Sequence, residues 1–332
     1  VCSSDLAVLN DPVVTASCTA KSILVNSGAV LDLATFNCQV LGNVVVSGTT
    51  AGTGAFQLQA AGQVQGNLRG LIVNAPVSLS SIAAILGDLT ISGAGASFDM
   101  NGFSASVAGN LVTQSAGLLI MNNPADNLNI SGSASFDGGN ELGQMSAGTL
   151  LIGTNFVQTA TSSGDSFHPS GTHLTVLGGA NPLISFATPG DVPGTSHFQE
   201  LGWAGGGTMT IGTDVYAHGT MDGSPGVTGT IASINHTLQV GNFVSGGVTF
   251  NGTALVINQA AGAPITISDL TFINMSSTVN RLTVNHPGTG SPFGFPNLTF
   301  AEVPTTGFYI SANDLNTGDA TPLTIDVLSS SP

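Results

Sequence analysis

Basic residues are nearly absent from this chain of 332 residues, which has three Lys and Arg against 18 Asp and Glu. Binding to nucleic acid requires clustered Lys and Arg that neutralise phosphates, so the formal net charge of −15 argues against a nucleic-acid partner. The same charge argues against adsorption to an anionic membrane surface. Apolar runs of about 18 residues or more, the length that spans a bilayer, are also missing. We therefore expect no direct insertion into a membrane.

Features that favour helices are equally scarce. The chain contains 45 Gly and 15 Pro, only 6% of its residues are charged, and no apolar period near 3.6 residues is sustained. Short runs rich in Val, Ile, Leu and Thr, each bounded by Gly, Asn or Ser, instead predict β-strands. These runs are 22–25, 43–46, 70–73, 88–91, 117–120, 127–130, 149–152, 173–176, 208–211, 237–240, 254–257, 264–267 and 281–284. We expect an all-β protein with almost no α-helix.

Whole blocks of the sequence recur further along the chain. The matched blocks are 30–44 with 97–111, which aligns Asp32 with Asp99, and 89–99 with 128–137, which aligns Leu89 with Leu128. The first offset predicts three coils of a stacked repeat and the second predicts two, each coil of roughly 20 to 24 residues. Stacking explains the short apolar strands, because one such coil cannot bury its apolar face alone.

The recurrence of blocks favours a β-solenoid over a β-sandwich, which also has short strands and frequent turns. The predicted fold is a single-stranded, right-handed parallel β-helix, its hand taken from the right-handed crossovers of parallel strands. We expect repeats over residues 7–269, with a longer loop near 186–226, and the last coils with a C-terminal cap over 270–332. An aromatic sugar-binding platform is the alternative interpretation of that cap. Residues 1–6 match the translation of a common sequencing adapter and are expected to be non-native.

Cys18 and Cys38 are separated along the chain by about the length of one coil. Equivalent positions on neighbouring coils are roughly 4.8 Å apart, which suits the Cα separation of a disulfide. A Cys18–Cys38 bridge implies an oxidising compartment. The alternative is a pair of buried free thiols. The third cysteine, Cys2, lies in the adapter-derived segment.

The dipeptide Gly-Asn recurs between strands and predicts the corners of the coils. Glycine supplies a positive φ, and the Asn side chains can stack in hydrogen-bonded ladders. The predicted corner residues are Asn43, Asn67, Asn110 and Asn242.

Motifs in the middle of the chain resemble a repeat of large bacterial surface proteins. The motif residues are 136–140, 146–158, 167–173, 184–186 and 196–198, with a Ser-Gly-Thr-His run ending at His173. The resemblance, over roughly residues 85–220, is to β-helical segments of secreted or cell-surface, adhesin-like proteins of environmental bacteria, which often also contain Ig-like domains. It implies an extracellular β-helical stalk and carries over no catalytic residue.

Candidate catalytic residues are few. A glycosidase needs two carboxyl groups about 5 to 9.5 Å apart, and the nearest candidates are Asp214 and Asp222, which flank His218. The alternative is that they are polar loop residues. A polyuronate lyase is disfavoured because it needs basic residues. His168 and His173 are interpreted as turn and wall residues.

One oxygen-rich run is a candidate calcium site, with hard ligands at Asp314, Asn316 and Asp319. It lacks the spacing of a regular calcium loop, and no other metal or cofactor is predicted.

The sequence thus predicts a non-enzymatic, extracellular, adhesin-like β-helix stalk of a bacterial surface or secreted protein. Surface glycans, other envelope proteins and further domains of the same polypeptide are the expected partners. The alternative function is a carbohydrate-binding or polysaccharide-degrading β-helix protein.

Overall fold

A computed structural model describes residues 6–8, 12–223, 229–234, 236–258, 267–273, 282–285, 298–300, 310–313 and 326–327. Side chains are described over 12–222, 229–234, 236–243 and 248–257. The described residues form β-strands joined by turns, and none of them is helical. Accordingly, the described part of the chain has no helix that is long and apolar enough to cross a membrane.

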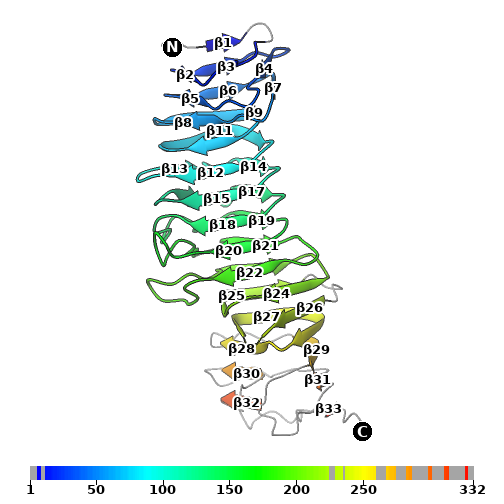
Figure 1. Cartoon of the computed structure of the whole chain (residues 1–332). Coiled ribbons are helices and arrows are strands. Elements are labelled where there is room, and N and C mark those ends of the chain that lie inside the picture. The colour runs from blue at the N-terminus through cyan, green and yellow to red at the C-terminus, as the bar shows by residue number, and fades with distance from the viewer. Residues whose placement is uncertain are drawn as a thin grey trace. The chain divides into compact units, whose positions relative to one another are not determined.

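Parallel strand pairing dominates the structure (Figure 1). The described strands form a parallel β-solenoid of about 10 turns, which confirms the predicted fold class. Contacts divide the chain into two units, Val1–Gly153 with Val157–Leu174 and Thr154–Phe156 with Thr175–Pro332. The expected boundary at 269/270 stays a prediction.

In the first unit, strands pair one above the next in columns. Column 1 contains β2 (Cys18–Ala20), β5 (Cys38–Val40), β8 (Phe56–Leu58), β10 (Leu71–Val73), β12 (Leu89–Ser92), β15 (Leu111–Gln114) and β18 (Ala134–Asp137). Column 2 contains β1 (Leu6–Val8), β3 (Ile23–Val25), β6 (Val44–Val46), β9 (Gly62–Leu68), β11 (Pro76–Ile85), β14 (Ser104–Val107), β17 (Asn127–Ile130) and β19 (Thr149–Ile152). The start of β11 also pairs with β13 (Ser97–Asp99), which pairs with β16 (Leu118–Ile120), and β4 (Val30–Asp32) pairs with β7 (Thr49–Ala51).

The second unit has parallel pairing of the same kind. One series contains β22 (Leu183–Phe186), β24 (Thr208–Ile211), β26 (Gly229–Ser233), the end of β27 (Thr237–Asn251), β29 (Ile267–Ile273), β31 (Leu298–Phe300) and β33 (Asp326–Val327). The other contains β23 (Glu200–Trp203), β25 (Val215–Gly223), the start of β27, β28 (Ala254–Asn258), β30 (Leu282–Asn285) and β32 (Ile310–Asn313). Two further strands, β20 (Phe156–Gln158) and β21 (Leu174–Leu177), contain residues of both units.

Coil length varies more than the sequence predicts. In the first unit the pairing of Phe56 with Leu71 closes a short coil, whereas the pairing of Leu111 with Ala134 closes a clearly longer one. In the second unit the pairing of Leu183 with Thr210 spans a still longer stretch of chain. Most paired strands keep one register along their length, and the loops between them absorb the difference in coil length. Segment 187–199, inside the predicted longer loop, is one such connection, and 138–148 and 159–173 are two that were not foreseen.

The recurring sequence blocks occupy different columns, so their offsets do not count whole coils. Leu89 lies in column 1, whereas its match Leu128 lies in column 2. Likewise Asn43 precedes a column 2 strand, whereas its match Asn110 precedes a column 1 strand. The interpretation of three and two complete coils is therefore wrong. The repeated unit is one strand with its corner.

The matched residues Asp32 and Asp99 nevertheless form the same local hydrogen bond. The Asp32 Oδ1 atom accepts the backbone N–H of Ala34 at 2.7 Å, and Asp99 Oδ1 accepts that of Asn101 at 2.9 Å. Ala34 and Asn101 both have a positive φ, 48° and 51°. Each aspartate closes a tight turn on a backbone conformation that non-glycine residues seldom adopt.

Alternation along each strand builds the interior. Inward positions are aliphatic or Phe, with Phe56, Phe98 and Phe136 all 0% exposed. In the first unit the rings of Phe136 and Phe167 lie 4.6 Å apart between centroids. In the second unit Phe156, Phe186 and Phe198 form a cluster with centroid separations of 4.8 to 5.1 Å. The described residues therefore enclose an aromatic-rich core in each unit.

Candidate functional site

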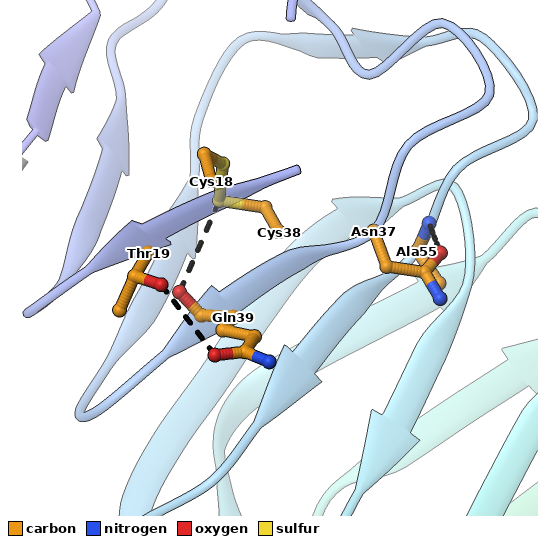
Figure 2. The surroundings of a disulfide bond; sticks show 6 residues. All are labelled: Cys18, Thr19, Asn37, Cys38, Gln39 and Ala55. Carbon is orange, nitrogen blue, oxygen red and sulfur yellow. Dashed lines mark hydrogen bonds between the residues drawn. A yellow bond between two sulfur atoms is a disulfide. The ribbon is translucent and has the colours of Figure 1, made fainter. Parts of the chain in front are cut away.

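A disulfide joins Cys18 and Cys38, which face each other directly on β2 and β5 (Figure 2). Their Cα atoms are 4.7 Å apart, so the spacing of the two cysteines along the chain does place them on neighbouring coils. The predicted bridge is confirmed, and the free-thiol alternative is wrong. Beside it, the Thr19 hydroxyl donates to Gln39 Oε1 at 3.4 Å.

Corner side chains bind the backbone of the following coil. The Asn43 Oδ1 atom accepts the N–H of Gln63 at 2.8 Å, and Asn110 Oδ1 accepts that of Ser133 at 2.9 Å. The same contact is made by Asn37, Asp88, Asn122 and Asp137 in the first unit, and by Asn155, Asn181 and Asp214 in the second. The sequence predicted the corner role of Asn43 and Asn110. It did not predict that Asp residues take the same role, in which a carboxylate Oδ1 atom replaces the amide Oδ1 atom.

The other two predicted corner residues are placed differently. Asn67 is an exposed residue within β9, and Asn242 lies within β27, where its Oδ1 atom accepts the N–H of the adjacent Phe243 at 2.9 Å. A Gly-Asn pair therefore does not by itself identify a side chain that connects two coils.

Residues of the motif that resembles bacterial surface repeats make the contacts that fix loop 159–173. The Gln158 side chain is 1% exposed and donates to the Ser166 hydroxyl at 3.0 Å, and that hydroxyl contacts the carbonyl of Phe136 at 3.2 Å. His168 Nδ1 lies 3.3 Å from Asp165 Oδ1, and both residues are buried. These contacts hold the loop against the first unit.

The imidazole of His173 is completely buried in the same unit. Its Nδ1 atom lies 2.9 Å from the carbonyl oxygen of Ala147, which can only accept, so Nδ1 carries the proton and Nε2 does not. Nε2 has no hydrogen-bond partner. Burial lowers the pKa of His173 to about 4. His173 is therefore a buried residue of the coil wall, and its imidazole is uncharged at neutral pH.

Glu141 is an acid that sequence reasoning missed. It is 0% exposed, its Oε1 atom accepts the N–H of Leu119 at 3.1 Å, and its Oε2 atom has no partner. Burial raises the pKa of this carboxyl well above the usual value for glutamate. The carboxyl takes the place of a strand of the next coil beside β16, since loop 138–148 runs there instead.

The three catalytic candidates are spread along β25. Asp214 directly precedes the strand, where its Oδ1 atom accepts the N–H of Thr237 at 2.9 Å and lies 3.6 Å from His236 Nδ1. Asp222 is exposed near the other end, and His218 lies between them. Asp214 and Asp222 thus lie at opposite ends of β25.

A surface pocket of about 200 Å³ lies on β25 and β27 of the second unit. It is lined by Asp191, Tyr216, Ala217, His218, Gln239, Val240 and Gly241. Burial raises the pKa of the Tyr216 phenol, and the negative charges of Asp214 and Asp191 raise it further. Of the three catalytic candidates only His218 lines this pocket.

Metal ligands are not gathered among the described residues, which contain no group of three or more His, Cys, Asp and Glu side chains suited to an ion. The calcium candidates Asp314, Asn316 and Asp319 lie outside the described residues.

Comparison with known proteins yields no match to a family model, a curated protein or a solved structure. The β-solenoid implied by the resemblance to bacterial surface repeats is confirmed by the structure itself.

Proposed function

We propose that this chain is a non-enzymatic structural segment of an extracellular protein, on a bacterial surface or in a secreted bacterial product. In this role the stacked coils display a polar surface with few basic residues to glycans or to other envelope proteins. The observation that carries the proposal is the regular connection of one coil to the next, by parallel strands, by corner Asn and Asp side chains and by a disulfide.

Two further observations support it. The Cys18–Cys38 bond suits an oxidising compartment. Asp214 is engaged in a corner contact with Thr237 and Asp222 is exposed near the far end of β25, which suits structural and surface roles better than a pair of catalytic carboxyls.

The test is a combined glycan-array and polysaccharide-depolymerisation screen of the full chain, with and without Ca²⁺. We expect retention of some glycans and no release of reducing ends. Release of sugar products that is lost in the double variant Asp214→Asn, Asp222→Asn would overturn the proposal and assign a glycosidase. Release that survives this double variant would equally contradict a non-enzymatic role and move the search for catalytic residues elsewhere.

A further inference from the structure

The pocket on β25 and β27 forms where the pairing of these strands changes register, between Ala217 and Thr220. Before the shift, Tyr216 is opposite Gln239 and Ala217 is opposite Val240. Ala217 and Val240 are both buried, so alternation places the side chains of Tyr216 and Gln239 together on the outer face. A change in strand register of this kind re-aims neighbouring side chains and is frequent next to binding sites.

Gly241 allows a close approach of the two strands beside the pocket that it lines. A Cβ atom at Gly241 would lie 2.3 Å from the backbone oxygen of His218, closer than any side chain can approach. The backbones of β25 and β27 therefore come together at this point without a side chain between them.

The loop that carries Asp191 is fixed to the same strand. Gly190, the preceding residue, donates its N–H to the carbonyl of Ser196 at 3.0 Å, and its own carbonyl lies 3.2 Å from Nδ1 of the buried His197. Phe198 then donates its N–H to Tyr216 O, and its carbonyl accepts the N–H of His218, both at 2.9 Å. Asp191 is thus placed at the rim by a loop whose two ends are anchored, which reduces the ordering cost of binding.

The chemistry of the lining indicates the class of ligand. A tyrosine ring offers an apolar face with a polar tip, and such a face also attracts cations. Gln239 and His218 supply hydrogen-bond donors and acceptors of the kind that pair with hydroxyl groups. Asp191 supplies a carboxylate, and no Lys or Arg lines the pocket. Anionic ligands are therefore disfavoured, and a cationic ligand gains from the net charge of −15.

The size of the pocket sets a limit on what it can enclose. Its volume of about 200 Å³ is smaller than the roughly 300 to 1,000 Å³ of pockets that bury drug-sized ligands. One sugar ring is a suitable occupant, and a longer glycan would extend from the pocket into solvent.

We propose that this pocket binds a saccharide unit that carries a protonated amine. The ammonium group pairs with Asp191 and one face of the sugar ring stacks on Tyr216. Hydroxyl groups of the ring pair with Gln239 and His218. This binding activity goes beyond the proposed structural role, and either can fail without the other.

The experiment is a titration of the full chain with D-glucosamine at pH 6, followed by calorimetry and by saturation-transfer NMR. We expect saturable binding of glucosamine, at least fivefold weaker binding of glucose and N-acetylglucosamine, and none of glucuronate. Asp191→Asn and Tyr216→Ala should each weaken glucosamine binding at least tenfold. Asp222→Asn is the matched control, because it removes the same charge from an exposed aspartate outside the pocket, and it should change the affinity less than twofold.

Three outcomes would overturn the proposal. These are the absence of saturable glucosamine binding, equal binding of glucose and glucosamine, and an equal effect of Asp191→Asn and Asp222→Asn. Thermal unfolding of each variant shows whether it is folded. Asp191 is exposed, so loss of binding in a folded Asp191→Asn variant reports on the pocket itself.

Discussion

The Oδ1 atom of Asp88 accepts the backbone N–H of Asn110 at 2.7 Å, across 22 residues of sequence. Asn110 in turn offers its own Oδ1 atom to the N–H of Ser133, on the coil that follows. Hydrogen bonding between coils therefore continues through the corner, where the strand ladder is interrupted. Side-chain oxygens replace the carbonyl groups that a strand would have supplied.

Replacing Asn110 with Ala should destabilise the first unit. The substitution removes the acceptor of the Ser133 N–H, and we expect a loss of about 1 kcal/mol in the free energy of unfolding. Asn67→Ala is the matched control, since Asn67 also follows a glycine but is an exposed residue within β9, and it should cost less than about 0.5 kcal/mol. Urea unfolding of both variants measures the difference, and equal losses would show that the Asn110 contact contributes nothing.

Removing the disulfide should have a larger effect. Cys18 and Cys38 are separated by 20 residues, and for a loop of this size the chain-entropy model gives about 3 kcal/mol of stabilisation. Cys18→Ser, Cys38→Ser is compared with the parent chain by guanidinium unfolding, in a Cys2→Ser background that prevents thiol exchange. The parent should approach the stability of the double variant when a reductant is added. A parent chain that is indifferent to reductant would contradict the prediction.

Much of this fold could be predicted because its signals are local. Gly, Asn and Ser flank many of the strands, and the spacing of Cys18 and Cys38 corresponds to one coil. The match of Asn43 with Asn110 was misleading, because it compares one strand and corner with another on a different column. Each such corner needs a side-chain acceptor for a backbone N–H of the following coil. Similar sequences therefore recur at more than one corner of a coil rather than once in each coil.

Sites formed by loops were not predictable in the same way. Glu141 stands in a Gly- and Asn-rich segment that has no periodicity, and its burial depends on where loop 138–148 meets β16. Asp191 and Tyr216 are distant in the sequence and belong to a loop and a strand. The proximity of Asp191 and Tyr216 depends on the contacts of His197 and Phe198, which cannot be predicted from the spacing of residues in the sequence.

Replacing Glu141 with Gln should stabilise the protein at neutral pH. Because the pKa of Glu141 is raised on folding, the unfolded chain releases this proton at a lower pH than the folded chain does. The stability that the protonated carboxyl provides is therefore complete below about pH 4.5 and decreases as the pH rises above that value. The amide keeps the acceptor for Leu119 and cannot ionise, so we expect a gain of about 1 to 2 kcal/mol at pH 7 and little change at pH 4.

Urea unfolding between pH 4 and pH 8 provides the measurement for Glu141→Gln. Glu141→Met is the control, because it also removes the titration but leaves the Leu119 N–H without its acceptor. Its stability should lie below that of Glu141→Gln by a constant amount at every pH. A parent chain whose stability relative to Glu141→Gln does not change with pH would disprove the role assigned to Glu141.

The buried imidazole of His173 predicts the opposite dependence on pH. Its pKa falls from 6.5 in the unfolded chain to about 4 in the folded one, so between these values only the unfolded chain takes up the proton. The contribution of His173 is present above pH 6.5 and is lost as the pH falls toward 4. A pKa difference of this size amounts to about 3 kcal/mol.

His173→Asn isolates this contribution, because its side-chain amide can still donate to the Ala147 carbonyl but does not titrate. Relative to the parent, this variant should gain about 3 kcal/mol between pH 7 and pH 4 in urea unfolding. His173→Phe fills the same space without a donor, so it should be less stable than His173→Asn by an amount that does not depend on pH. If the parent and His173→Asn respond identically to acid, the imidazole takes up its proton without unfolding the chain, and the buried ring does not limit stability at low pH.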